Sequence, residues 1–215
     1  MQNESNCPPQ QPTVVQIQPP GIQPLPVQIQ TPKVIYINFF DGVNESKVKT
    51  LMGMLSQMVA TNKPETLYFL FSSPGGSVDA GIVLYNFLRA LPVEIIMHNT
   101  GTVASIGTVI YMAGAKRYAA PQSTFLFHGV QTTFAPGVAM SHPQLLERLS
   151  MVRQDENKIA GIIASRSTLS GEEIRKLFHQ GESKDLAFAQ EKGIIHEIRE
   201  ANIPKDAPFI TVNLN

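Results

Sequence analysis

The chain has 215 residues, 43% of them hydrophobic, and its 17 basic residues balance 17 acidic ones to a formal net charge of zero at pH 7. This length suffices for one substantial buried core, while the neutral balance, without a basic cluster, argues against nucleic acid or an anionic membrane surface as a partner. Cys7 is the single cysteine, which excludes an internal disulfide and a thiolate metal site.

The start of the chain consists mainly of Pro, Gln and short polar residues, up to about residue 33. Such a segment buries too little apolar area to offset its ordering entropy, so we expect a disordered arm over residues 1–33 and one folded domain over 34–215. The alternative is a docking peptide that adds a strand to a partner. No Lys or Arg precedes an apolar stretch here, and we expect a cytoplasmic protein without a secretory signal or membrane span.

Apolar runs and helical stripes alternate along the next hundred residues. The expected strands cover residues 34–40, 67–72, 93–98, 117–119 and 124–128, and the expected helices cover 46–60, 77–90 and 104–114. Repeated strand and helix units of this length favour an α/β fold with a mostly parallel sheet wrapped by helices.

A long helix is expected from about His142 to Ser165. The helix has more apolar surface along one side than a small domain could cover if the helix projects from it. This predicts that the helix docks against a neighbouring subunit. The sequence Ser170-Gly-Glu-Glu173 indicates a capping box that opens a short helix. A last short helix is expected near Leu186 to Lys192.

Ser105 lies in a turn of small residues, Gly101-Thr-Val-Ala-Ser-Ile-Gly107, and His128 ends a predicted strand. A serine hydroxyl is a weak nucleophile at neutral pH, so it needs a base to accept its proton and donors to hold the oxyanion that forms. The helix expected after Ser105 would turn free N–H groups toward this turn. The pair therefore favours a serine peptidase, although a helix-capping serine and a strand-end histidine are the ordinary readings of each residue alone.

A second turn, Ser73-Pro-Gly-Gly76, connects a predicted strand to a predicted helix. Its two glycines permit positive φ angles and close approach by another backbone. The turn lacks the Lys-Ser/Thr of a P-loop and the third glycine of a dinucleotide fingerprint, so alone it indicates no more than a tight turn or a weak phosphate cradle.

Three motifs occur in order: Ser73-Pro-Gly-Gly76, then Gly101 to Gly107, then Arg117-x3-Pro121-x3-Phe-Leu-Phe-His128. Over about Val34 to Ile198 the chain thereby resembles the ClpP family, the proteolytic subunit of the ATP-dependent Clp protease. The resemblance implies a ClpP/crotonase-like spiral of ββα units with a projecting handle helix. It also implies that Ser105 is the nucleophile and His128 the general base, and that Gly76 and Ile106 donate the oxyanion-hole N–H groups.

The third member of the triad departs from the family pattern. In the family an Asp lies about a dozen residues before a Gly-aliphatic-aliphatic-Asp motif, which here reads Gly193-Ile-Ile-His196. Counting back reaches Gly181. A one-residue deletion would bring Glu182 to the position, and a tighter loop would present Asp185 instead. Either carboxylate could hold the histidine tautomer and stabilise its imidazolium, and Glu182 is the first choice.

Two further departures affect the substrate and the partners. Gly129-Val130 follows His128 where the family has Gln-Pro, which alters the strand that would receive an extended peptide. The resemblance implies stacked heptameric rings that act on peptides or unfolded proteins, with an AAA+ unfoldase as partner. Residues 1–33 stand where the family has its axial segment, so docking to an unfoldase is not carried over.

Three other functions compete with the peptidase. A catalytically weak ring scaffold that binds peptides is motivated by the displaced acid. A crotonase-like enzyme acting on a CoA thioester would use similar oxyanion geometry, but the Ser105–His128 motif would then have no purpose. A Ser-Lys peptidase needs a lysine that the sequence does not place near Ser105. We expect no cofactor and no metal, since the histidines lack the paired spacing of a zinc site; these are His98, His142, His179 and His196.

Overall fold

The computed structural model describes residues 33–212. The arm predicted over residues 1–33 lies outside the described residues apart from Lys33, so it stays a prediction. Within residues 33–212, every helix is too short or too polar to cross a lipid bilayer. The same part of the chain contains no group of three or more His, Cys, Asp or Glu side chains arranged to hold a metal ion.

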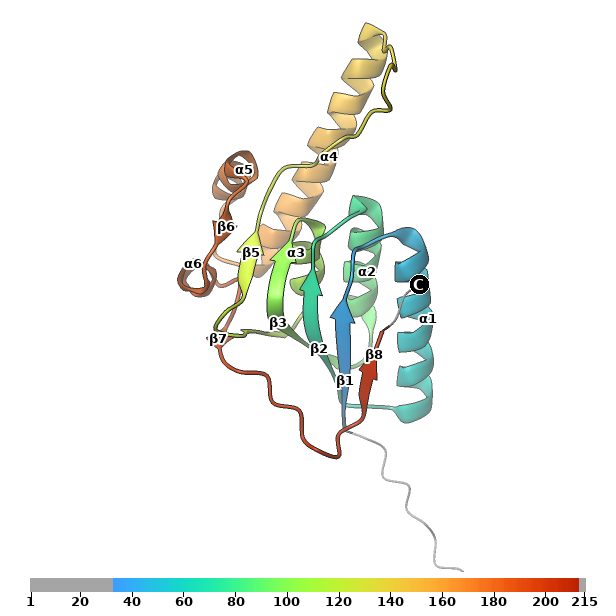
Figure 1. Ribbon diagram of the computed structural model, residues 1–215, viewed down its shortest axis with the longest axis vertical. Helices are drawn as coiled ribbons and strands as arrows, with labels where there is room; N and C mark the ends of the chain where they lie inside the picture. The colour runs from blue at the N-terminus through green and yellow to red at the C-terminus, as the bar shows by residue number, and fades with distance from the viewer. Residues whose placement is uncertain (1–32, 213–215) are drawn as a thin grey trace, which may run out of the picture. The chain divides into compact units, whose positions relative to one another are not determined.

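A mostly parallel sheet organises the described residues (Figure 1). Its strands are β1 (Val34–Phe40), β2 (Thr66–Ser73), β3 (Glu94–Ala104), β4 (Lys116–Ala119), β5 (Thr124–Leu126), β6 (Ser183–Lys184), β7 (Glu197–Ile198) and β8 (Phe209–Thr211). The strand order is β6-β5-β3-β2-β1-β8. Outside this order, β4 pairs with β3 on one side and with β7 on the other. The β5–β6 pair is antiparallel, and the other pairs are parallel. The α/β fold class is confirmed.

The helices are α1 (Glu45–Asn62), α2 (Val78–Ala90), α3 (Ile106–Tyr111), α4 (His142–Arg166), α5 (Gly171–Gln180) and α6 (Leu186–Glu191). Side chains cap several of them as the residue types predict: Ser77 accepts from the backbone N–H of Ala80 at the start of α2. The capping box of Ser170 and Glu173 at the start of α5 is confirmed. Figure 1 shows α4 extending beyond the end of the sheet, as expected for a handle helix.

Three elements differ in their bounds from the sequence prediction. The strand expected over 93–98 runs to Ala104, the helix expected over 104–114 covers only Ile106–Tyr111, and the strand expected to end at His128 ends at Leu126. The helix expected from Ala104 begins at Ile106, because β3 continues through Ala104. Thr102, Val103 and Ala104 pair in parallel with residues 124–126 of β5, and this long-range pairing overrides the local small-residue pattern. The register of β3 against β2 shifts between Phe71 and Ser73, where the two strands reach the site.

The main core lies between the sheet and helices α1 to α3. Phe39 and Phe71 stack on neighbouring strands with ring centroids 5.2 Å apart, and Tyr111 of α3 packs edge-on against Phe125 of β5. A smaller cluster of Tyr36, Tyr68 and Ile96 packs against Ile203 and Ala207, which belong to the connection between β7 and β8. The second cluster lies toward the beginnings of β1, β2 and β3, away from the strand ends that lead to the candidate site.

His98 is a structural residue of this second cluster. Its Nδ1 is 2.7 Å from the Tyr68 hydroxyl, and its Nε2 is 2.9 Å from the backbone oxygen of Arg199. Burial lowers the pKa of His98 because the charged imidazolium would lose its hydration. A buried histidine with both nitrogens occupied is a satisfied core residue.

Candidate active site

Ser105 sits at the junction between β3 and α3 in a strained backbone conformation. Its φ of 56° and ψ of −133° lie outside the regions that L-residues ordinarily occupy. Its N–H donates to the backbone oxygen of Leu126 at 2.9 Å, which ties the turn to β5. Although Ser105 is the N-cap residue of α3, its side chain makes no capping hydrogen bond. The hydroxyl is therefore available for another role.

The glycine turn after β2 packs directly against Ser105. Gly75 has φ 91° and Gly76 has φ 149°, both values that favour glycine. A Cβ atom on Gly75 would stand 2.6 Å from the Cβ of Ser105. A Cβ on Gly76 would collide with the backbone oxygen of Val43. The two glycines thus allow the backbone to pass close to the candidate nucleophile.

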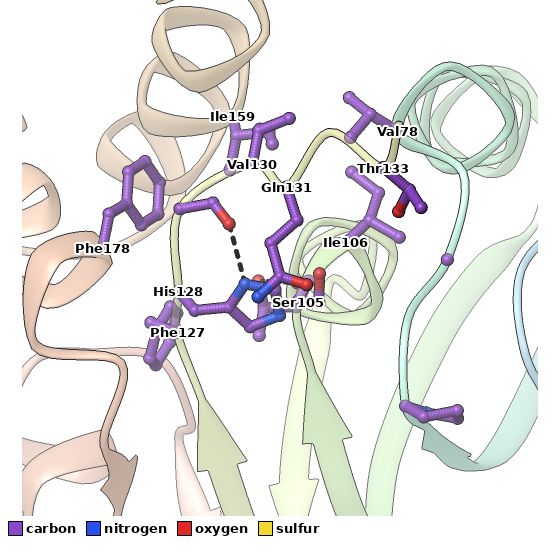
Figure 2. A pocket seen from close by; sticks show the side chains of 14 residues that line it. Val78, Ser105, Ile106, Phe127, His128, Val130, Gln131, Thr133, Ile159 and Phe178 are labelled. Atoms are coloured by element: carbon purple, nitrogen blue, oxygen red, sulfur yellow. Dashed lines mark hydrogen bonds between the residues drawn. The ribbon is translucent and has the colours of Figure 1, made fainter. Parts of the chain in front are cut away.

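Ser105 and His128 line one pocket of about 300 Å³. Figure 2 shows both side chains turned into it, with apolar side chains around them. The lining residues are Pro74, Gly76, Val78, Ser105, Ile106, Thr108, Phe127, His128, Gly129, Val130, Gln131, Thr133, Ile159 and Phe178. A pocket with apolar walls and a few converging polar groups is the usual form of a small-ligand or substrate site.

His128 is half-buried and lies two residues beyond the end of β5, after Phe127. Its Nδ1 lies 2.7 Å from the backbone oxygen of Gly129, the contact drawn as a dashed line in Figure 2. A carbonyl oxygen can only accept, so Nδ1 carries the proton when the ring is neutral. Nε2 is then unprotonated, which is the form that a general base requires.

The backbone amides predicted to form an oxyanion hole belong to the same pocket. Gly76 and Ile106 both line it, together with Ser105. Ile106 is the first residue of α3, and the first N–H groups of a helix have no intrahelical acceptor. One cavity thus holds the candidate nucleophile, the candidate base and the candidate N–H donors, which is the set that acyl transfer needs.

The comparison with known families agrees with this chemistry. A sequence model of the Clp protease family matches residues 30–202, which is most of the chain. The chain belongs to the Clp protease family. Its general reaction is accordingly that of a serine-type peptidase, a hydrolase.

Individual relatives extend over different lengths. The ATP-dependent Clp protease proteolytic subunit of Lactococcus lactis subsp. cremoris is 26% identical over 198 residues, covering 89% of this chain and 96% of that protein. Proteolytic subunit 1 of Bacillus cereus is 28% identical over 69% of this chain and 75% of its own length. Proteolytic subunit 2 of Pseudomonas aeruginosa is 35% identical over 89 residues, or 40% of this chain and 44% of that protein.

The two carboxylates proposed for the Clp triad have other partners in this structure. Glu182 is 66% exposed and its Oε2 lies 3.2 Å from Lys184 Nζ. Asp185 is the N-cap of α6, where its Oδ1 accepts from the N–H of Phe188 at 2.9 Å. Within residues 33–212, His128 is hydrogen-bonded to neither carboxylate. The identity of the triad acid stays a prediction.

Strand register explains why Gly181 matters. Leu126 of β5 pairs with Ser183 of β6 in an antiparallel ladder. Continuing that register by two residues sets Gly181 beside His128, and side chains alternate faces along a strand. Position 181 lies beyond the end of β6, so this extended register places it near His128 without assigning its side chain to a face of the sheet. Gly181 has φ 60° and caps the end of α5, so this chain has a helix-ending glycine at that place.

One contact near the base was not expected from the sequence. Glu156, on α4, accepts a hydrogen bond from the backbone N–H of Val130 at 3.2 Å. The residue is 28 positions from His128 and sits in a polar stretch of a long helix. Local periodicity gives no indication that this carboxylate reaches the turn after the histidine.

Proposed function

We propose that this Clp protease family member cleaves peptide bonds through an acyl-enzyme on Ser105, with His128 as the general base. The observation that carries the proposal is the strained Ser105, whose uncapped hydroxyl shares a pocket with a histidine held by its Nδ1. A hydroxyl used only for capping would bond the first turn of α3 instead.

In the proposed mechanism, His128 Nε2 accepts the hydroxyl proton as Ser105 Oγ attacks the scissile carbonyl carbon. The N–H groups of Gly76 and Ile106 donate to the oxyanion of the tetrahedral intermediate. The intermediate collapses as the imidazolium protonates the leaving amine, which breaks the peptide C–N bond. Water, deprotonated by His128, then attacks the acyl-enzyme and releases Ser105.

Glu182 is our proposed carboxylate partner for the imidazolium, with Asp185 as the alternative. Glu182 immediately precedes β6, the strand next to β5, but it would have to leave Lys184 to face His128. A kcat loss in Glu182→Gln, with Asp185→Asn unchanged, would support it. Equal activity of Glu182→Gln and the wild-type protein would remove Glu182 from the mechanism.

The substrates we propose are short peptides and unfolded proteins, bound in extended form beside the pocket. We also propose homo-oligomers, in the form of stacked heptameric rings. Support comes from α4, where Leu145, Leu146 and Leu149 are all exposed on the projecting part of the helix. The relatives are named as subunits of an ATP-dependent protease. An AAA+ unfoldase is the partner that the family resemblance implies, and docking to it is not carried over to this chain. The cytoplasm is the location that we predict from the sequence.

A catalytically weak ring scaffold that binds peptides is the second candidate. Its support is that neither Glu182 nor Asp185 is hydrogen-bonded to His128 in the described residues. Neutralising a triad acid can cost ~10⁴-fold in rate, so a site without one would leave binding and oligomerisation as the main activities. A CoA-thioester enzyme is less favoured, because it gives the Ser105–His128 pair no role.

Hydrolysis of a fluorogenic peptide library tests the two candidates. Ser105→Ala and His128→Ala are compared with Ser56→Ala, which removes an exposed hydroxyl from the middle of α1. The peptidase predicts turnover by the wild-type protein and Ser56→Ala, and none by the two site variants. Turnover that survives Ser105→Ala would contradict the proposed mechanism, and peptide binding without turnover by the wild-type protein would favour the scaffold.

A further inference from the structure

The turn that follows His128 is fixed by main-chain contacts from two helices. Gly129 N–H donates to the backbone oxygen of Phe178 on α5 at 3.1 Å. The next N–H, that of Val130, donates to Glu156 Oε1 on α4 at 3.2 Å. Between these two N–H groups lies the Gly129 carbonyl that holds His128 Nδ1 at 2.7 Å. The peptide unit holding the imidazole is thus clamped on both sides.

In this position the Glu156 carboxylate occupies space that a side chain on residue 129 would enter. A Cβ atom on Gly129 would stand 2.7 Å from Glu156 Oε1, well inside normal contact distance. The φ of Gly129 is not positive, so backbone conformation does not require glycine there. Glycine, at the position where the family pattern has a glutamine, leaves this space open for the carboxylate.

We propose that Glu156 is a positioning residue for His128. By holding the peptide unit between Gly129 and Val130, it keeps the Gly129 carbonyl aimed at Nδ1, and this selects the tautomer with a free Nε2. A triad acid ordinarily fixes the tautomer, but in the described residues neither Glu182 nor Asp185 is hydrogen-bonded to His128. The inference rests on the proposed roles of Ser105 and His128.

The contact has the features of a strong and specific anchor. Glu156 is half-buried, and a hydrogen bond from a backbone N–H to a carboxylate is stronger than one between neutral groups. Figure 2 shows Val130 and Ile159, the latter from α4, close together above His128. The apolar packing around Val130 limits the water that could replace the carboxylate, so removing Glu156 leaves the turn without an equivalent acceptor.

Two substitutions at Glu156 separate positioning from simple packing. Glu156→Ala removes the acceptor, so kcat is expected to fall about 10- to 100-fold with little change in KM. Glu156→Gln keeps a carbonyl oxygen that can accept from Val130 N–H and is expected to recover most of that loss. Glu172→Ala serves as the matched control, since this glutamate is 77% exposed on α5 and pairs with Lys176.

Gly129→Ala provides an independent variant should Glu156→Ala fail to fold. The added methyl displaces the Glu156 carboxylate without removing it, and the same kcat loss is expected. Because the two substitutions break one contact, the double variant Gly129→Ala/Glu156→Ala should lose no more activity than the worse single variant. Additive losses would show that the two residues act separately and would overturn the inference.

The experiment measures kcat, KM and thermal unfolding on the full-length oligomeric protein, with crystal structures of the wild-type protein and Glu156→Ala. Support consists of the kcat loss, its rescue by glutamine, and an Nδ1 of His128 displaced from the Gly129 oxygen. A Glu156→Ala protein within twofold of wild-type kcat, or an unchanged His128 ring, would overturn the inference. Full activity of Ser105→Ala would instead refute the proposed function, and the crystal structures would still test the role of Glu156.

Discussion

Gly76 lies against Val43 so closely that no side chain can stand between them. Val43 N–H donates to the oxygen of Gly75 at 2.8 Å, and the oxygen of Val43 accepts from Ser77 N–H at 2.8 Å. Val43 itself is buried. These two hydrogen bonds with Val43 fix the backbone on either side of Gly76, and so they fix the direction in which the Gly76 N–H points. The proposed oxyanion hole depends on that direction.

Gly76→Ala is therefore expected to lower kcat by about 10²-fold or more while leaving the chain folded. The methyl group collides with the Val43 oxygen, and φ 149° is unfavourable for alanine, so the peptide unit must rotate. Gly53→Ala is the control, because a Cβ there meets nothing within 4 Å. Steady-state peptide hydrolysis measures the effect, and a Gly76→Ala enzyme with wild-type kcat would exclude this amide from the oxyanion hole.

The strained backbone at Ser105 predicts that a substitution which relieves the strain makes the protein more stable while abolishing its activity. A non-glycine residue at φ 56°, ψ −133° costs about 1–3 kcal/mol, which glycine relieves and alanine does not. Ser105→Gly should therefore be more stable than Ser105→Ala by about 1 kcal/mol after its larger unfolded-state entropy is included, and both should be inactive. Urea unfolding of the two variants makes the comparison. A less stable Ser105→Gly would show that the conformation is not strained.

A carboxylate at position 181 should increase activity. A Cβ on Gly181 meets nothing within 4 Å, and Asp tolerates a φ of 60° better than most residues. Extending the β5–β6 register by two residues places position 181 opposite His128, so Gly181→Asp is expected to raise kcat several-fold by stabilising the imidazolium. Gly181→Asn is the uncharged control. Identical kcat values for the two variants would mean that the added carboxylate does not reach the histidine.

Low pH should destabilise α5, because Glu173 of its capping box becomes protonated. Hydrogen bonds from the Ser170 backbone, and then from Lys192, lower the pKa of Glu173 from an ordinary 4.5 to about 2. A carboxylate with a lowered folded-state pKa stabilises the fold above its unfolded pKa, and this stabilisation is lost as the pH falls from about 4.5 to 2.

Glu173→Gln should therefore have a melting temperature that depends less on pH between 5 and 2 than that of the wild-type protein. Thermal unfolding across this range tests the expectation, with Glu172→Gln as the adjacent control outside the capping box. Parallel pH profiles for the Glu173→Gln and wild-type proteins would contradict the role of the cap. The helix matters for the site because Phe178 on α5 accepts the Gly129 N–H.

Much of the fold and the main pair of the site could be predicted because their signals are local. Alternating apolar runs and amphipathic helix patterns identified β1, β2, α1, α2 and α4 to within a few residues, and only the first half of β3. Ser105 and His128 stood out as motif residues, and the structure places both in one pocket. Ser170 and Glu173 show their capping role within four residues of sequence.

The remainder depends on contacts between distant parts of the chain. The extension of β3 to Ala104 comes from pairing with β5, and β8 forms only because Phe209–Thr211 returns to the edge of β1. Glu156 reaches Val130 because α4 folds back over the site. A single sequence carries no period or spacing that encodes such tertiary contacts.

Labelling with a fluorophosphonate, followed by intact-mass analysis, tests the central claim most directly. The account predicts one adduct on the wild-type chain and none on Ser105→Ala or His128→Ala, because only a serine activated by its base displaces fluoride from the probe. A wild-type chain that stays unlabelled, under conditions that label a control serine peptidase, would contradict an activated Ser105.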